Sequence, residues 1–183
     1  MKENLERNQQ TNHRTISKRY TNTTKLAIGA IYTALATMLQ SAGGFTGIGY
    51  ALSILTTLPI LMSSLLSIRI GLLSYSLTMI LLWIFQPSEL IIFPFTTGLL
   101  GITLGIAFKR WKGWFGPVTV GGIGLTIGIL FLLYILRFPV LGPSISNSFN
   151  LTTALIILLF SFVYSLIWVG LIKKFISQRL PFS

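Results

Sequence analysis

The stretch LTTALIILLFSFVYSLIWVGLI, residues 151–172, decides the class of fold, because no charged residue interrupts it and Lys173 and Lys174 follow it directly. A helix needs about 20 mostly apolar residues to cross the hydrocarbon core of a bilayer. Basic residues that flank such a helix stay on the cytoplasmic side during insertion. The stretch therefore predicts a membrane-spanning helix with its carboxyl end in the cytoplasm.

The composition of the whole chain agrees with this interpretation. Of the 183 residues, 52% are hydrophobic and 9% are charged, whereas about a quarter of the residues in a soluble domain are charged. A chain of this length has room for one membrane bundle and one tail, with no separate soluble catalytic domain.

Working outward from residues 151–172, we predict an all-α bundle of six transmembrane helices. Their expected ranges are 24–42, 51–67, 71–85, 90–108, 117–136 and 151–172. Pro59 predicts a kink within the second helix, because proline removes a backbone hydrogen bond. We divide the chain into a disordered basic cytoplasmic tail (1–23), a six-helix transmembrane domain (24–176) and a short cytoplasmic tail (177–183).

The distribution of positive charge predicts the orientation of this bundle. All of the 14 basic residues except Arg137 fall in segments on one side of a six-helix topology. The positive-inside rule then places both termini in the cytoplasm of a cell-membrane protein. The net charge of +11 is thereby explained by topology and by contact with anionic membrane lipids, so no nucleic-acid partner is expected.

Residues that could support catalysis are scarce in the predicted bundle. The chain has no cysteine, and its one histidine, His13, and two of its three acids, Glu3 and Glu6, lie in the tail. Intramembrane hydrolases need paired carboxylates or a histidine at membrane depth. A glycine-rich nucleotide loop with its lysine is also missing. We therefore expect no enzyme activity, no metal site, no cofactor and no ATPase site within this chain.

A candidate binding site lies on the predicted outer side, where Glu89 and Arg137 are the only charged residues. Charge near a membrane is costly unless it is paired, hydrated or functional. Polar and aromatic residues that could complete a small-molecule pocket stand nearby in the predicted topology. The predicted substrate-binding residues are Trp83, Gln86, Glu89, Tyr134, Arg137, Asn147 and Asn150. The alternative is that Glu89 and Arg137 are hydrated interfacial charges, which would contribute little to binding.

Small residues mark candidate helix contacts. Ala30 and Ala34 are one helical turn apart in the first predicted helix, where two small side chains let another backbone approach closely. They predict an interface with a partner protein, and the alternative is ordinary packing inside the bundle. Two glycine stripes, by contrast, predict tight contacts within the chain itself. These stripes are Gly98, Gly101 and Gly105, and Gly121, Gly124 and Gly128.

Two segments carry a resemblance to a known family. The first helix, KLAIGAIYTALA (25–36), resembles that of the substrate-binding S components of energy-coupling factor transporters. The segment FPFTTGLLGITLG (93–105) resembles the fourth helix, rich in proline and glycine, of a related uncharacterised membrane family of the same superfamily. In the S components the Ala-x-x-x-Ala helix docks onto a transmembrane coupling subunit, and Ala30 and Ala34 match this pattern. The resemblance implies capture of a vitamin-like small molecule on the outer face, with energy from partner ATPase subunits.

Two other functions stay open from the sequence. One is a membrane scaffold or assembly protein without a ligand, which would use the same helices. The other is an ion-coupled secondary transporter, which is disfavoured because proton coupling usually needs ionisable residues at membrane depth and none is apparent.

Overall fold

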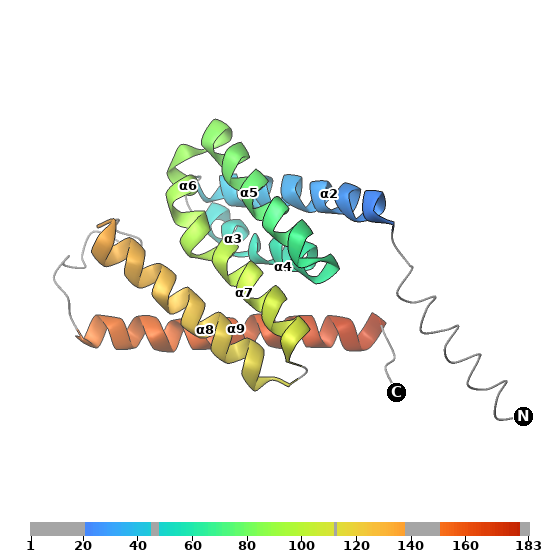
Figure 1. The fold of residues 1–183 in the computed structure, drawn as a ribbon. Helices are drawn as coiled ribbons and strands as arrows, with labels where there is room; N and C mark the ends of the chain where they lie inside the picture. Colours follow the sequence, from blue (N-terminus) through green and yellow to red (C-terminus); the bar gives the residue numbers. More distant parts are fainter. Residues whose placement is uncertain (1–20, 45–47, 112, 138–150, 180–183) are drawn as a thin grey trace, which may run out of the picture.

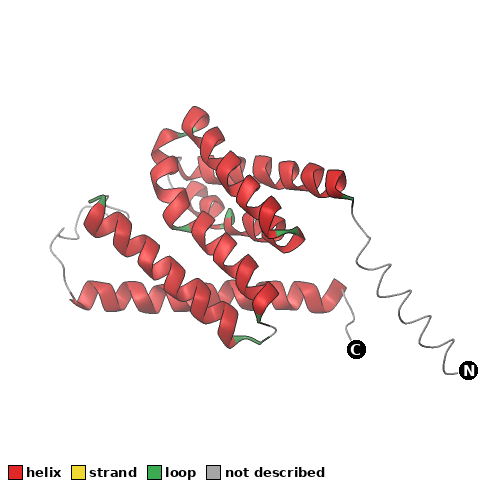
Figure 2. Ribbon diagram, in the orientation of Figure 1, coloured by secondary structure: helices red, strands yellow, loops and turns green. Residues whose placement is uncertain are grey.

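The structure is a computed structural model that describes residues 21–44, 48–111, 113–137 and 151–179. Within these ranges the chain is helical and contains no strand, which confirms the predicted all-α class (Figure 2). Residues 1–20 and 180–183 of the predicted tails fall outside the described residues, as do the predicted site residues Asn147 and Asn150.

The helices follow one another closely along the chain. Three short helical turns link or extend them: the 3₁₀ turns η1 (Ala42–Gly44) and η2 (Phe93–Phe95) and the π turn η3 (Phe131–Ile135). The α-helices are α2 (Asn22–Ser41), α3 (Ile48–Ile54), α4 (Thr57–Leu66), α5 (Ile68–Phe85), α6 (Pro87–Ile92), α7 (Thr97–Arg110), α8 (Phe115–Leu130) and α9 (Leu151–Arg179).

Five helical stretches of the described chain are long and apolar enough to cross a membrane, which indicates a multi-pass membrane protein. They are Asn22–Gly44, Ile68–Phe85, Pro87–Arg110, Phe115–Ile135 and Leu151–Lys174. The predicted second span differs from the others, because Ala51–Leu66 is shorter than the length that a regular helix needs for a crossing.

This shorter segment is broken at Leu55 and Thr56, between α3 and α4. The expected irregularity near Pro59 is therefore present, four residues before the proline. Pro59 has no N–H to donate to the carbonyl of Leu55, and the N–H of Leu58 bonds that carbonyl instead at 3.0 Å. The preceding carbonyl, of Ile54, accepts a hydrogen bond from the Tyr164 hydroxyl at 3.2 Å.

Helices α2 and α5 run in the same direction, side by side. Near their amino ends, Gly29 packs against Ile70, with 2.5 Å between a Cβ built on Gly29 and the Ile70 side chain. Near their carboxyl ends, the side chain of Gln86 fills the space beside Gly44. Because both helices run the same way, the chain between them must return from one end of the bundle to the other.

The α3–α4 segment makes this return. At its start, Ser53 lies beside Gly43, at the carboxyl end of α2. Near its end, Ser64 contacts both Gly71 at the start of α5 and Gly105 late in α7. The broken helix thus connects the two ends of the bundle in space, even though neither half is a full span.

The remaining helices alternate in direction. Along α8, Gly121 packs on Leu104, and Gly128 meets the carbonyl of Phe95 before α7 begins, so α7 and α8 are antiparallel. Helix α9 returns beside α8, because Lys173 near its end lies 5.0 Å from the ring of Trp114. The start of α2 and the end of α9 therefore lie on the same side of the bundle (Figure 1).

One consequence is that the basic residues at the helix ends gather at one end of the bundle. Helix starts supply Lys25 and Arg69, the end of α7 supplies Lys109 and Arg110, and α9 supplies Lys173 and Lys174. Glu89 and Arg137 lie at the opposite helix ends, as the charge pattern predicted.

The two glycine stripes make the close intrachain contacts that the sequence predicted. A Cβ added at Gly101 would lie 2.8 Å from the Ile60 side chain, and one at Gly124 would lie 3.1 Å from Thr103. Helices α4, α7, α8 and α9 can therefore approach closely enough to enclose the larger core cluster. Its fully buried members include Leu61, Leu100, Leu104 and Val169.

Candidate functional site

Glu89 is buried within the helical bundle and is only 5% exposed. Its position follows from local sequence, because Pro87 begins helix α6 and Glu89 falls in the first turn of that helix. Proline favours the first helical position, and an acid in the first turn faces the positive end of the helix dipole. The alternative of a hydrated surface charge is therefore wrong for Glu89.

Gln40 organises the surroundings of Glu89. Its Nε2 donates hydrogen bonds to Oε2 of Glu89 at 2.7 Å and to Oγ of Ser53 at 3.0 Å. Its Oε1 accepts a hydrogen bond from Oγ1 of Thr97 at 2.8 Å. We call these four residues the Gln40 cluster; they come from α2, α3, α6 and α7. Four helical segments thus meet at one buried polar group.

The other carboxylate oxygen of Glu89 faces the backbone of Gly43. A Cβ on Gly43 would lie 2.9 Å from Oε1 of Glu89 and 3.1 Å from Cβ of Ser53. No described residue donates a hydrogen bond to Oε1; the Gln40 amide bonds Oε2 alone. Glycine at position 43 therefore lets its backbone pack closely against Oε1, an oxygen whose acceptor capacity no described residue uses.

Arg137 does not balance the charge of Glu89. It is exposed at the end of η3, with a backbone φ of 52°, a left-handed conformation that is uncommon for a residue other than glycine. Both residues belong to the described chain, and no ion pair joins them. Arg137, the other charged residue predicted at this site, therefore does not neutralise Glu89. Glu89 is hydrogen-bonded but lacks a basic partner within the described ranges.

The other predicted site residues that the structure describes do not converge on Glu89. Trp83 is 70% exposed on α5, and Tyr134 packs against the larger core cluster. Gln86 lies near Glu89 in the chain, but its Nε2 donates to Oγ of Ser88 at 3.2 Å. The predicted pocket is therefore not assembled by these aromatic residues in the part of the chain that the structure describes.

Sequence reasoning missed Gln40, Ser53 and Thr97. A signal for Gln40 was available, because it is the one amide side chain within the first predicted helix and a buried amide needs hydrogen-bond partners. Ser53 and Thr97 carried no such signal, since small hydroxyl residues commonly bond their own helix. As to metals, the described residues contain no group of three or more potential ligands among His, Cys, Asp and Glu.

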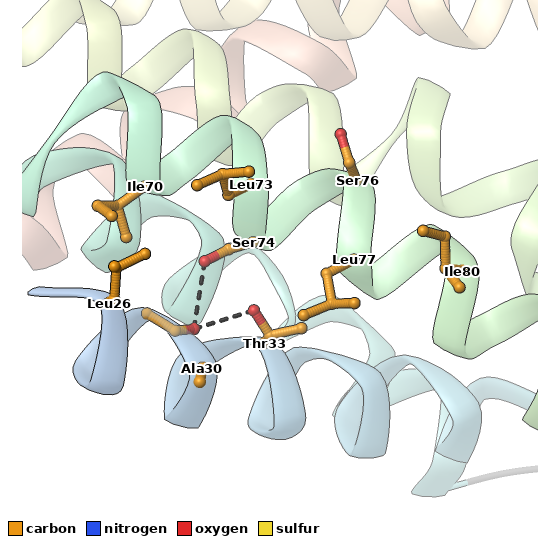
Figure 3. Close-up of a pocket in the computed structure, with 10 residues that line it drawn as sticks. Leu26, Ala30, Thr33, Ile70, Leu73, Ser74, Ser76, Leu77 and Ile80 are labelled. Atoms are coloured by element: carbon orange, nitrogen blue, oxygen red, sulfur yellow. Dashed lines mark hydrogen bonds between the residues drawn. The ribbon is translucent and has the colours of Figure 1, made fainter. Parts of the chain in front are cut away.

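A second feature is an apolar groove of about 480 Å³ between α2 and α5 (Figure 3). On its floor, the carbonyl of Gly29 accepts hydrogen bonds from Thr33 at 2.9 Å and from Ser74 at 3.2 Å. These polar groups are satisfied internally, so the groove presents mainly hydrocarbon. Its apolar lining includes Leu26, Ala30, Ile70, Leu73, Leu77 and Ile80.

Ala30 and Ala34 lie on the exposed face of α2. The buried residues of this helix occupy the other face, and they are Gly29, Thr33, Ala36, Thr37 and Gln40. The alternative in which the two alanines pack inside the bundle is therefore wrong. Ala30 instead borders the groove, so a small-residue face and an apolar groove are continuous on the surface of α2.

Comparisons of the chain with protein-family models, curated proteins and solved structures find no match.

Proposed function

We propose that this chain is the substrate-binding membrane subunit of an importer of the energy-coupling factor type. It would capture a vitamin-like small molecule at the outer end of the bundle and would depend on a transmembrane coupling subunit and partner ATPases for energy. The observation that carries the proposal is the exposed Ala30–Ala34 face of α2 beside the apolar groove, since small residues on a membrane helix permit close approach of another helix.

The proposed topology has six crossings, with both termini in the cytoplasm of a cell-membrane protein. Its support is the parallel arrangement of α2 and α5, which requires the intervening α3–α4 segment to return through the bundle. A broken helix at membrane depth is tolerated where other helices cover it and satisfy its backbone. Collection of the basic helix ends on one side supports a cytoplasmic assignment for that side.

The proposed ligand end is the opposite end, around the Gln40 cluster. Buried polar groups that converge from several helices are suited to fix the orientation of a small molecule. Glu89 has one carboxylate oxygen held by Gln40 and the other facing the small Gly43. Trp83 and Tyr134, which we expected to form the aromatic walls of the binding pocket, are not part of the site proposed around the Gln40 cluster.

A matched pair of substitutions on α2 tests the partner interface. We expect Ala34→Leu to abolish co-purification of the coupling and ATPase subunits and to leave the melting temperature of the isolated protein nearly unchanged. Ala36 serves as the control, because it is fully buried on the opposite face of the same helix. Ala36→Leu should lower the melting temperature, since overpacking a core costs about 1–3 kcal/mol.

The two variants separate the possible results. Loss of partners in Ala34→Leu with a normal melting temperature supports the importer. Retention of the same partners by Ala34→Leu, or co-purification of no ATPase with the wild-type protein, would sink the proposal. The solute-binding step would be followed in the same preparations by mass spectrometry of small molecules released from the protein.

Burial of Glu89 favours one second candidate, an ion-coupled secondary transporter. The sequence alone disfavoured this function because no ionisable residue was apparent at membrane depth, and a buried acid within the Pro87–Arg110 stretch weakens that objection. Liposomes that contain the purified chain alone discriminate the two functions. Solute uptake driven by a proton or sodium gradient, without ATPase subunits, would favour the secondary transporter.

A further inference from the structure

We propose that Glu89 binds a positive charge and that the solute held at the Gln40 cluster is a cation with an ammonium-type group. The inference rests on the proposed function, because it assigns a chemical class to the solute bound at that end of the bundle. It also distinguishes this solute from an anionic or uncharged one.

The first step concerns charge. Glu89 is the only acid among the described residues, and Glu3 and Glu6 are the other two acids of the chain. A buried carboxylate without an opposite charge is strongly unfavourable in a membrane protein. Within the described chain, neither lysine nor arginine pairs with it. An incoming positive charge would relieve this imbalance.

The second step concerns the groups that face Glu89. Gln40 from α2 bonds Glu89 and Gly43 from η1 packs against it, and Ser53 from α3 and Thr97 from α7 surround the Gln40 amide. None of these groups is charged or titrates near neutral pH. The basic helix ends lie at the far end of the bundle, and the nearer Arg137 is exposed and unpaired with Glu89. An anionic solute would therefore meet the negative charge of Glu89 without compensation from these neighbours.

The third step concerns hydrogen-bonding capacity. Both amide hydrogens of Gln40 are already donated, to Ser53 and Glu89, and the Thr97 hydroxyl donates to Gln40. The cluster thus has few donors left for an anion. Oε1 of Glu89, however, accepts no hydrogen bond from a described residue and retains acceptor capacity. An N–H donor that carries positive charge would form a charge-assisted hydrogen bond there, which is the stronger class.

The small number of acids makes the test specific. In full-length protein that carries Glu3→Gln and Glu6→Gln, Glu89 is the only remaining side-chain carboxyl group. This protein, reconstituted in phosphatidylcholine liposomes, which add no other carboxyl group, would be titrated with methylammonium chloride at constant pH. Sodium chloride at the same ionic strength serves as the parallel probe. Infrared difference spectra would then report the carboxylate stretching bands of Glu89.

We expect a saturable change in those bands with methylammonium and little change with sodium. Adding Glu89→Gln should remove the carboxylate signal and weaken methylammonium binding at least about tenfold, measured by calorimetry. A second variant, Gly43→Ala, keeps the acid but places a methyl group beside Oε1, and it should also weaken binding. Gly113→Ala is its control, because nothing lies within 4 Å of a Cβ at that position.

Other outcomes would overturn the inference. A response to sodium alone would make Glu89 an inorganic-ion site, and a response to pH alone would make it a proton site. No response to any of the three would show that Glu89 is structural. These results are independent of partner binding: loss of the ATPase partners with methylammonium binding intact would reject the importer and keep the cation site.

Discussion

Nε2 of Gln40 lies 2.7 Å from Oε2 of Glu89 and joins the end of α2 to a residue 49 positions later in the chain. The same nitrogen bonds Ser53, and the amide oxygen accepts from Thr97. Because every polar atom of this amide is used, Gln40 fixes how four helical segments meet. A buried amide whose hydrogen bonds are all made in this way favours one packing arrangement of its neighbours.

Replacement of Gln40 by leucine should destabilise the protein. The substitution removes the donor to the buried Glu89 carboxylate and the acceptor for Thr97, and each buried polar group left unsatisfied costs about 1–3 kcal/mol. We expect a clearly lower melting temperature in mild detergent. Gln86→Leu is the matched control, because the only hydrogen bond of the Gln86 side chain to a described residue is to the exposed Ser88. Equal melting temperatures for the two variants would contradict the structural role of Gln40.

Gly128 should be the glycine least tolerant of substitution. A Cβ at this position would overlap the backbone carbonyl of Phe95, and a backbone atom cannot rotate aside as a side chain can. Overpacking costs of about 1–3 kcal/mol are typical, and backbone collisions should reach the upper part of that range. We expect Gly128→Ala to lower the melting temperature strongly, and Gly113→Ala, in open space, to leave it unchanged. An unchanged value for Gly128→Ala would mean that α8 is not packed against η2.

Regular features of the fold could be predicted from the sequence. The apolar stretches are long, so the five helices that match them were expected within a few residues. The glycine stripes of α7 and α8 also predicted close helix contacts, since glycine in a membrane helix is used mainly for packing. For the break between α3 and α4, the sequence predicted only a kink near Pro59. The exact place of the break could not be predicted, because it depends on which carbonyl the proline leaves without a donor.

The candidate site was predicted less well. Glu89 was selected because it is the only acid in the predicted bundle, but the sequence did not reveal that it turns inward. That orientation depends on α6, a six-residue helix too short to show a periodic pattern. Its partner Gln40 is 49 positions away, and such long-range contacts follow from helix packing. For the same reason, Trp83 and Tyr134 were grouped with Glu89 although they face elsewhere.

Replacement of two buried threonines by valine should change the stability of the protein differently. Oγ1 of Thr97 donates to Gln40, whereas Oγ1 of Thr56 is buried without a hydrogen-bond partner among the described residues. Valine has nearly the shape of threonine, so each substitution removes mainly the hydroxyl. Thr97→Val should lower stability by about 1 kcal/mol, and Thr56→Val should be neutral or stabilising. Thermal melts of both variants check this, and destabilisation by Thr56→Val would indicate an ordered partner at the helix break.

The orientation of the bundle can be measured by single cysteines, because the chain contains none. In intact cells, an impermeant thiol reagent should label Ser88→Cys at the outer end. It should label Gly113→Cys, in the turn between α7 and α8, only after lysis. Both positions are exposed in the structure, so a missing signal would not reflect burial. External labelling of Gly113→Cys would reverse the orientation that we derive from the basic residues.

A third cysteine decides whether the broken α3–α4 segment crosses the membrane. Ser67 lies directly between α4 and α5. It should be labelled only after lysis if the segment makes a sixth crossing. The parallel course of α2 and α5 leads us to expect this result, since two parallel spans need a return between them. The segment has 16 residues, Ala51–Leu66, and a helix of that length is about 24 Å long at 1.5 Å per residue. This is shorter than the roughly 30 Å hydrocarbon core of the bilayer. Local thinning of the bilayer or extended residues at the ends of the segment must therefore supply the rest. Labelling of Ser67→Cys from the opposite side to a cysteine at the exposed Thr21, at the start of α2, would exclude the sixth crossing and place the termini on opposite sides.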